Sequence, residues 1–380
     1  MAAAPALLDG VRVLSIEQYA AGPYGTQLLV DLGAEVVKVE NAETGGDVSR
    51  ALTPHLLGAS DSQFFQTFSR GKKSICLNLK DPQDRQRFEA LLPRFDAVAN
   101  NLRGDLPASL GLRYEDLSAA NPQIVCAHLS AYGRDNSRAA WPGYDYLMQA
   151  EGGFLALTGE PDGPPARFGL SMVDFMTGSL MALSLVAAVL SARRTHIGCD
   201  VDTSLFDTAL HQLSYPATWY LNEAQVTERL PRSSHPSIVP SQLFRTADGW
   251  MFVMCQTPKF WQRFCESLQR PQWAADPRFL TPPDRLQHRA ALETEIETVL
   301  RTASTEHWCA ELAGVVPVAP VYDVGQALDN TFVQEVGMTH RIAHPERPDG
   351  LRVLSSPFKI NGQRPVSSRA PLLGEHDDET

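Results

Sequence analysis

Residues 7–40 read LLDGVRVLSIEQYAAGPYGTQLLVDLGAEVVKVE, in which apolar runs alternate with segments rich in Gly and Pro. Short apolar runs predict β-strands, and Gly and Pro mark the points where chain direction changes. The predicted elements are, in order, a strand at residues 11–15, a turn at 21–25, a helix at 26–32 that ends at Gly33, and a strand at 35–40. A strand–helix–strand unit of this kind joins two parallel strands of one sheet.

The same alternation continues through residue 203. Further strands are predicted at residues 74–79, 96–101, 124–130 and 199–203, and Asp81-Pro82 predicts the start of a helix at 81–92. Alternating strands and helices predict a Rossmann-like α/β fold, in which helices cover a parallel sheet. Ligands of such sheets bind beyond the carboxyl ends of the strands, where Asn101 and Arg103 fall.

A dinucleotide-binding protein is one alternative for this pattern, because Glu40 ends the second strand where a ribose could be held. The fingerprint G-x-G-x-x-G is incomplete, however. Only Gly22 and Gly25 are present, with Pro23 between them. Three glycines are needed for the turn, for the approach of the pyrophosphate and for helix packing, so the sequence does not favour an NAD site.

The character of the chain changes after residue 213. Residues 227–240 are rich in Ser, Pro, Arg and His with weak periodicity, and residues 242–254 contain Asp248-Gly249 between two β-rich runs, which predicts a hairpin. Helices are predicted at 258–268, 284–302, 305–313 and 324–336. We therefore expect a large domain at 1–213, a linker or loop at 214–240, a smaller α+β domain at 241–322, and a return segment at 323–380 that completes the large domain.

Composition limits the partners that the protein can bind. The chain of 380 residues has a formal net charge of -11 and a pI near 5.4, which disfavours nucleic acid bound by a general basic surface. An anionic ligand must then meet a local group of cations. Arg70, Lys72 and Lys73 form such a group before a strand, and the alternatives are a phosphate contact or a solvated charge run.

The cysteines and the first ten residues indicate which kinds of site and signal are not expected. The six cysteines are scattered, without a C-x-x-C pair or a histidine cluster, so we expect free thiols and no metal site. Residues 1–10 have no basic n-region and no long apolar core, which predicts no secretory signal and a cytoplasmic location.

Asp174 stands directly before an uncharged run at residues 175–192. A helix that is apolar on all sides is expected inside a large protein, and the run is short for a membrane span, so no membrane is expected. An ordinary Asp has a pKa of about 3.9, so near neutrality it is ionised and can act as a nucleophile without a general base. Two interpretations remain open here, a catalytic nucleophile and a simple helix N-cap.

Several stretches together resemble the class III CoA-transferases, the family of formyl-CoA transferase and carnitine CoA-transferase. These stretches are residues 7–40 together with SRGKKSICLNLKDP, PGYDYLMQAEGG, SMVDFMTG and RAPLLGEHDDET, which follow in the family's order as far as Glu379. The resemblance implies an interlocked homodimer of two ring-like chains. It also implies an enzyme that transfers coenzyme A between an acyl-CoA and a free carboxylic acid, with no permanently bound cofactor.

The resemblance implies site residues position by position. The family's nucleophile falls on Asp174, and its contacts to coenzyme A fall on Ala20, Asn41, Leu77, Lys80, Asn101, Arg103 and Tyr144. Asn41 and Ser109 stand where formyl-CoA transferase has arginines, so phosphate contacts are expected from Lys72, Lys73, Lys80 or Arg103. The glycine-rich loop of that enzyme is replaced by residues 235–240, HPSIVP, which puts formate-like substrates in doubt.

The implied chemistry forms a mixed anhydride on Asp174 and then an aspartyl-CoA thioester, without ATP or a metal. The oxyanions need preorganised donors, for which backbone N–H groups near the helix start or a mobile loop are candidates. Nothing in the residues selects the two acids. One alternative is an acyl-CoA racemase of the same fold, whose histidine is replaced here by Tyr144; a base near neutrality is commonly His. The other alternative is a non-catalytic CoA-binding protein, which would not need an acid at position 174.

Overall fold

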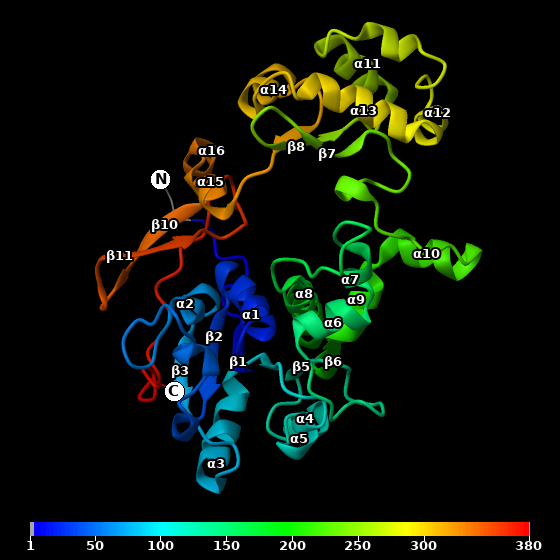
Figure 1. Ribbon diagram of the computed structural model, residues 1–380. Coiled ribbons are helices and arrows are strands. Elements are labelled where there is room, and N and C mark those ends of the chain that lie inside the picture. Colours follow the sequence, from blue (N-terminus) through cyan, green and yellow to red (C-terminus); the bar gives the residue numbers. More distant parts are fainter. Residues whose placement is uncertain (1–3, 380) are drawn as a thin grey trace. The chain divides into compact units, whose positions relative to one another are not determined.

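The computed structural model describes residues 4–379, which form two compact units (Figure 1). Unit 1 comprises residues 4–152, 169–214 and 331–379, and unit 2 comprises residues 153–168 and 215–330. Each unit is interrupted in the sequence by segments of the other. The four domain segments expected from the sequence remain a prediction, which limited proteolysis can test.

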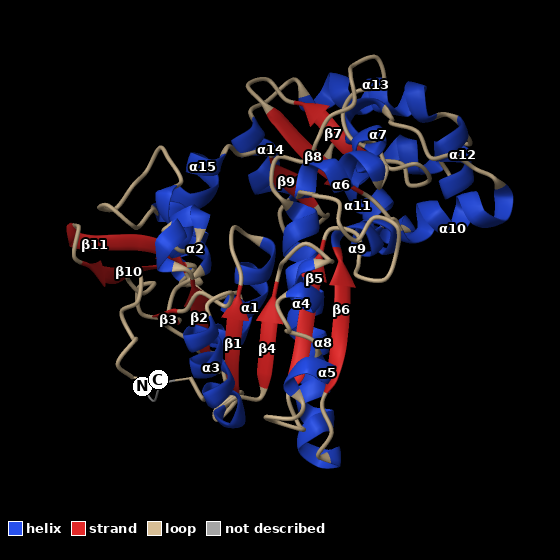
Figure 2. Cartoon of the chain, turned by 90° about the horizontal axis from the view of Figure 1, so that it is seen from below, coloured by secondary structure: helices blue, strands red, loops and turns tan. Residues whose placement is uncertain are grey.

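Unit 1 contains a six-stranded parallel sheet in the order β3-β2-β1-β4-β5-β6. Its strands are β1 (Arg12–Ile16), β2 (Glu35–Glu40), β3 (Lys73–Cys76), β4 (Ala97–Asn100), β5 (Val125–Ser130) and β6 (Cys199–Ser204). Figure 2 shows the arrowheads of β1, β4, β5 and β6 pointing the same way. The predicted parallel sheet covered by helices is thus confirmed, and all carboxyl ends of its strands lie at one edge.

Helix α1 (Ala21–Asp31) starts at the residues for which a turn was expected, so that prediction is wrong. Gly25 of this helix serves close packing against α8 (Met172–Thr195). A Cβ atom on Gly25 would lie 2.4 Å from the backbone O of Gly178, and one on Gly178 would lie 2.3 Å from the backbone O of Ala21. No side chain fits at these points, and the start of α8 is held tightly against α1.

Helix α8 is only partly buried, which corrects the expectation of burial on all sides. Val173, Met181 and Leu185 face the core, whereas Leu183 and Leu190 are 67% and 72% exposed. Within residues 4–379 this is the one helix that is long and apolar enough to cross a membrane, judged by length and composition alone. It packs on α1, β5 and β6, as a core helix of an α/β sheet does.

The remaining elements of unit 1 cover the sheet or follow it. They are η1 (Ala42–Thr44), η2 (Val48–Ala51), α2 (Gln63–Phe68), α3 (Pro82–Leu91), η3 (Leu92–Arg94), α4 (Leu106–Ser109), α5 (Tyr114–Leu117), α6 (Asp145–Glu151), α9 (Leu205–Gln212), α16 (Thr331–Glu335), β10 (Thr339–His344) and β11 (Arg347–Leu354). Helix α3 begins as predicted, because the Asp81 carboxylate accepts the N–H groups of Gln83 and Asp84 and Pro82 occupies the first turn. The predicted helix at 324–336 is divided at Asn330.

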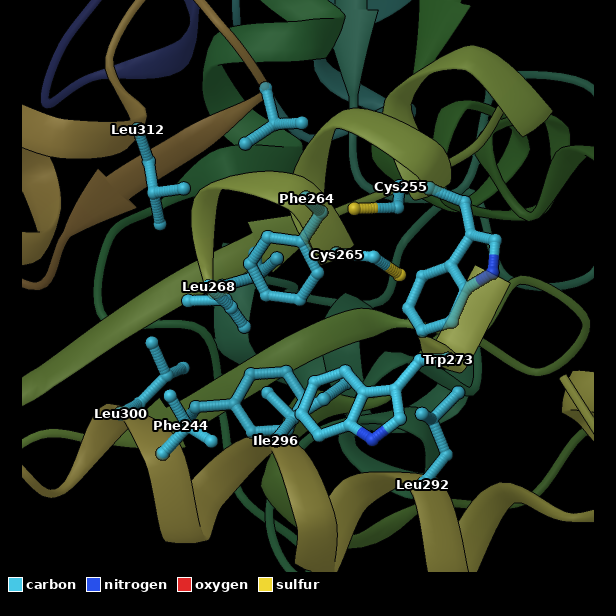
Figure 3. Close-up of a cluster of buried hydrophobic side chains, with 14 of the residues drawn as sticks. Phe244, Cys255, Phe264, Cys265, Leu268, Trp273, Leu292, Ile296, Leu300 and Leu312 are labelled. Carbon is cyan, nitrogen blue, oxygen red and sulfur yellow. The ribbon is translucent and has the colours of Figure 1, made fainter. Parts of the chain in front are cut away.

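Unit 2 contains an antiparallel sheet of β7 (Ser241–Arg245), β8 (Trp250–Met254) and β9 (Val318–Pro320). The hairpin predicted around Asp248-Gly249 joins β7 to β8. Helices of the unit are α7 (Phe154–Leu157), α10 (Ser214–Glu223), η4 (Pro231–Ser233), α11 (Pro258–Ser267), η5 (Pro271–Ala275), α12 (Pro282–Gln287), α13 (Arg289–Leu300), α14 (Thr305–Leu312) and α15 (Val324–Asp329). Figure 3 shows the unit's core, in which Phe244, Phe264 and Ile296 are fully buried.

Candidate active site

Two cavities of unit 1 lie beyond the carboxyl ends of the parallel strands and contain all the predicted site residues. The first has a volume of about 200 Å³, and its lining includes Ala20, Asn101, Arg103, Tyr144 and Asp174. The second has a volume of about 390 Å³, and its lining includes Asn41, Leu77 and Lys80. The structure therefore brings five of the predicted residues together and places the other three in a separate cavity of the same sheet edge.

A third cavity of unit 1 is larger, about 790 Å³, but it contains none of the predicted site residues. Its two arginines are already paired with carboxylates. Arg134 donates to both oxygens of Asp202, at 2.5 and 2.8 Å, and Arg113 pairs with Asp116. None of the residues that line it is a predicted site residue, so volume alone does not make this cavity the site.

Asp174 lies in the first turn of α8, three residues after the capping residue Ser171. Its backbone N–H donates to Oδ2 of Asp145 at 2.9 Å, and Asp145 is 3% exposed. The carboxylate of Asp174 itself accepts no hydrogen bond from residues 4–379. The interpretation of Asp174 as an N-cap is therefore wrong, and Asp145 supplies the acceptor that this helix start needs.

The ionisation state of Asp174 differs from that expected for an ordinary Asp. Burial, and after it the negative charge of Asp145, raise the pKa of Asp174 to about 7. Low polarity and a neighbouring anion both favour the neutral acid. Asp174 is therefore poised near neutrality, with comparable amounts of acid and carboxylate, rather than fully ionised.

Asp145 and Gln149 of α6 are site residues that the sequence analysis missed. Gln149 is buried and its amide Nε2 donates to Oδ1 of Asp145 at 2.5 Å, which fixes that carboxylate beside Asp174. The available signal was the second acid of the segment Gly143-Tyr144-Asp145-Tyr146. Because Asp145 occupies the N–H of Asp174, that group is not available as an oxyanion donor, although the sequence analysis had named N–H groups near the helix start as candidates.

Asn101 fixes the loop that forms one wall of the first cavity. Its Oδ1 accepts the N–H of Gln18 at 2.9 Å, and its Nδ2 donates to the carbonyl of Gln18 at 2.7 Å. Two hydrogen bonds to one residue hold the loop in register with the end of β4. Ala20, which is buried, follows in this loop as the residue before α1.

Arg103 is exposed at the rim of the first cavity, as a phosphate contact would have to be. Its Nε and Nη2 donate to the two oxygens of Asp105 at 2.6 and 2.8 Å. An exposed pair of this kind contributes little to stability, so Arg103 can exchange Asp105 for a ligand oxygen at small cost.

Tyr144 is 61% exposed, and its hydroxyl makes no hydrogen bond within the part of the chain that the structure describes. Its ring meets the ring of Tyr19 edge to face, with centroids 6.1 Å apart. Tyr19 lines the same cavity and was not predicted from the sequence.

The second cavity combines an apolar floor with polar groups at its rim. Leu77 is 3% exposed and lies just after β3. The Oδ1 of Asn41 accepts the N–H of Glu43, so this side chain is used as a cap of η1. Lys80 is exposed and forms no ion pair among residues 4–379. Lys80 is the cation of this cavity that a phosphate can reach.

The cluster of Arg70, Lys72 and Lys73 is neither a phosphate site nor a solvated charge run. The Nζ of Lys72, which is 3% exposed, donates to Oε1 of Glu17 at 2.8 Å and to Oγ1 of Thr26 at 2.7 Å. Burial lowers the pKa of Lys72 to about 8. Arg70 is 7% exposed and donates to backbone carbonyls, and Lys73 pairs with glutamates. Among the predicted phosphate contacts, this leaves Lys80 and Arg103 accessible.

Glu40 is not available for a ribose, which removes the main support for a dinucleotide site. Its carboxylate accepts two hydrogen bonds from Arg50, at 2.8 and 2.7 Å, and one from Ser74. Burial opposes ionisation, but the hydrogen bonds from Arg50 and the charges of Lys38 and Arg50 lower the pKa of Glu40 to about 2. Glu40 is a buried structural anion.

Comparison with known proteins gives one consistent result. A family model described as CoA-transferase family III matches residues 8–377. A succinyl-CoA:mesaconate CoA-transferase from Haloarcula marismortui is 32% identical over 98% of this chain and 95% of its own length. An acetyl-CoA:oxalate CoA-transferase from Acetobacter aceti is 32% identical over 97% and 93%. The crystal structure of a CAIB/BAIF family protein from Brucella suis has a TM-score of 0.83 and 30% identity, covering 98% of this chain and 97% of that one.

Proposed function

The chain belongs to CoA-transferase family III, and on that premise we propose that it works through covalent intermediates on Asp174. As a CoA-transferase, it moves coenzyme A between an acyl-CoA and a free carboxylic acid. The observation that carries the proposal is the state of Asp174, a carboxylate with no hydrogen-bond donor in the cavity that also holds Arg103 and Tyr144. Perturbed acids in a cleft are typical of catalytic groups.

The proposed reaction exchanges one activated acyl group for another. The carboxylate of Asp174 attacks the thioester carbonyl, and the C–S bond breaks to give a mixed anhydride and CoA thiolate. The thiolate then attacks the carbonyl of Asp174, releasing the first acid and leaving an aspartyl-CoA thioester. An incoming carboxylate repeats the two steps in reverse order, which regenerates Asp174. The sequence consumes no ATP, and no step requires a metal.

The raised pKa of Asp174 suits this role. A carboxylate whose conjugate acid has a pKa near 7 is a stronger nucleophile than an ordinary carboxylate, while a usable fraction remains ionised at neutral pH. Burial also deprives the anion of solvating water, which strengthens its interaction with the thioester carbonyl. Asp145 thus acts on Asp174 through charge and not through contact with substrate.

We place coenzyme A across the sheet edge, with its nucleotide part toward the second cavity and its thioester in the first. Leu77 offers an apolar surface for the adenine, and Lys80 and Arg103 offer cations for the phosphates. Ala20, Asn41, Asn101 and Tyr144 complete the predicted contacts.

Replacement of Arg103 tests this placement. Arg103→Ala should raise the KM for the acyl-CoA about 10-fold, the value of a charge-assisted hydrogen bond, and change kcat little. Thermal stability should stay the same, because the Arg103–Asp105 pair is exposed. The matched control is Arg87→Ala, another exposed arginine paired with a nearby aspartate, for which no kinetic change is expected. A fall in thermal stability with an unchanged KM would make Arg103 a structural residue and remove it from the site.

The acids that are exchanged can be identified directly. The relatives from Haloarcula marismortui and Acetobacter aceti are named for dicarboxylic acids, which makes succinyl-CoA a reasonable first donor. Incubation with a panel of acyl-CoAs and free acids should yield new acyl-CoAs, identified by mass. Hydrolysis of every thioester without formation of a new one would contradict the proposal.

The other interpretations lack support at the site. No histidine lines the cavity of Asp174 in the described chain, so a racemase would be without its expected base. Membership of a transferase family sets aside a non-catalytic CoA-binding protein.

We also propose that the enzyme is a homodimer. The exposed face of α8 carries Leu183 and Leu190, and an apolar helix face of this kind is stabilised when another surface covers it. Sedimentation analysis at progressively lower concentration should show a dimer until the chain unfolds. Folded monomers at low concentration would contradict a dimer that persists until the chain unfolds.

A further inference from the structure

Tyr19 has a backbone conformation that a tyrosine rarely adopts. It follows β1 and precedes α1, and its φ is 63°, in the left-handed region. Side chains with a Cβ are crowded there, so glycine is the residue expected at such a point. A bulky residue keeps this conformation only where the surrounding structure imposes it, and such residues cluster at functional sites.

Hydrogen bonds with buried side chains hold the backbone of Tyr19 in this conformation. The N–H of Tyr19 donates to Oδ1 of Asp47 at 3.2 Å, and Oδ2 of Asp47 accepts from Nζ of Lys38 at 3.0 Å. The same Nζ donates to the carbonyl of Glu17 at 3.3 Å. Lys38 and Asp47 are almost completely buried. With Gln18 held by Asn101, residues 17–19 are fixed at consecutive backbone groups.

Two further buried ion pairs, both formed by Glu17, anchor this arrangement. The carboxylate of Glu17 lies 3.5 Å from Nζ of Lys38 and 2.8 Å from Nζ of Lys72. Burial opposes its ionisation, but Lys72 and Lys38 lower the pKa of Glu17. The cluster of Glu17, Lys38, Asp47 and Lys72 thus carries two charges of each sign. Removing one partner of such a pair is costly, so the loop above it is firmly positioned.

Tyr19 in this conformation lines the first cavity, the one that contains Asp174. Tyr19 is 38% exposed, and its ring stands at 86° to the ring of Tyr144, which lines the same cavity. Rigid aromatic side chains provide large contact area with little loss of conformational entropy. Two such rings beside one carboxylate form a wall against which a bound molecule can be oriented.

We propose that Tyr19 holds the thioester end of the acyl-CoA against Asp174, and that the buried charged cluster maintains its strained backbone for this purpose. The inference rests on the proposed role of Asp174 as the nucleophile. Tyr19 would touch the substrate, whereas Asp47 and Lys38 would act through Tyr19 as positioning residues. Small displacements of a reacting group slow a reaction strongly, which gives the strain a function.

The Tyr19→Gly variant removes the ring of Tyr19 but permits its left-handed backbone, so it tests the role of the ring alone. Glycine accepts the left-handed conformation, so the variant should fold with no loss of thermal stability. Acylation of Asp174 in a single turnover, and kcat, should fall about 100-fold, the usual effect of a misplaced reactant. The dissociation constant of coenzyme A, which lacks the acyl group, should change much less. Tyr19→Phe, which keeps the ring, should lose far less rate than Tyr19→Gly.

Gln269→Gly is the matched control, because Gln269 also has a left-handed backbone, with a φ of 57°, but lies in unit 2 outside both cavities. It should show a similar change in thermal stability and no change in rate. Wild-type kcat in Tyr19→Gly would overturn the inference, as would a Tyr19→Phe variant as slow as Tyr19→Gly. Failure of the proposed function is distinguishable, because the wild type itself would then form no acyl group on Asp174.

Discussion

Asp174→Asn should abolish CoA transfer and, at about pH 8, give a protein more stable than the wild type by about 1–3 kcal/mol. The amide cannot form an anhydride, so kcat should fall by at least about 10⁴-fold, as expected when a nucleophile is lost. The gain in stability follows from the raised pKa. At this pH the wild type holds a partly buried anion next to Asp145, and that cost disappears in the variant. Urea unfolding and a transfer assay measure the two effects.

The sign of the stability effect depends on pH. The folded protein binds the proton of Asp174 more tightly than the unfolded chain, whose Asp has an ordinary pKa of about 3.9. Wild-type stability is therefore lost as pH rises from about 4 through about 7, and the difference between variant and wild type should shrink again toward about pH 4. Asp174 is only partly buried, so solvent and relaxation around the charge keep the effect below the full linkage value.

Asp284→Asn is the control for this experiment. Asp284 occupies the same position in the first turn of α12, but its carboxylate accepts hydrogen bonds from Thr281. These hydrogen bonds lower the pKa of Asp284. The variant should keep its activity and lose a little stability. An Asp174→Asn enzyme with substantial activity would exclude Asp174 as the nucleophile. A variant that is less stable than the wild type at about pH 8 would contradict the raised pKa of Asp174.

The acylation rate should follow the ionisation of Asp174. Only the carboxylate attacks the thioester, so kcat/KM for the acyl-CoA should fall about tenfold per pH unit below a midpoint near 7 and level off above it. Asp145→Asn should shift this midpoint to lower pH, because it removes the second cause of the raised pKa. Its amide oxygen can still accept the N–H of Asp174, so the helix start is preserved.

Stopped-flow measurement of the first half-reaction between about pH 5 and about pH 9 gives the profile directly. Lys72, whose pKa is about 8, also titrates in this range, but it does not line the cavity of Asp174, so the ionisation near pH 7 is the one that Asp145→Asn should move. A rate that is independent of pH over this range would contradict a midpoint near 7. An unchanged midpoint in Asp145→Asn would show that Asp145 is not a cause of the shift.

The main features of the fold could be predicted from the sequence because they depend on local pattern. Apolar runs separated by helices are enough to predict the parallel sheet. The start of α1 was mispredicted because a glycine such as Gly25 has two possible uses, a turn or close helix packing. Gly178, which makes the second use necessary, lies far away in the sequence.

The site could be predicted as a set of residues but not in its electrostatics. Asp174 and Arg103 stand in segments that resemble a known family, so their positions were accessible. The raised pKa of Asp174 depends on burial and on Asp145 across a tertiary contact. Lys72 was expected near phosphates because its sequence neighbours are cationic, whereas its actual partner is Glu17, which no local pattern indicates. The left-handed backbone of Tyr19 has no sequence signal.

Chemical trapping tests the central claim most directly. The wild-type enzyme is incubated with an acyl-CoA, treated with hydroxylamine and digested, and the peptide that contains Asp174 is examined by mass spectrometry. Hydroxylamine converts an activated carboxyl group to a hydroxamate, so a mass shift confined to Asp174, dependent on the acyl-CoA and absent from Asp174→Asn, is the expected result. A hydroxamate on another carboxylate, or none during active turnover, would contradict the account.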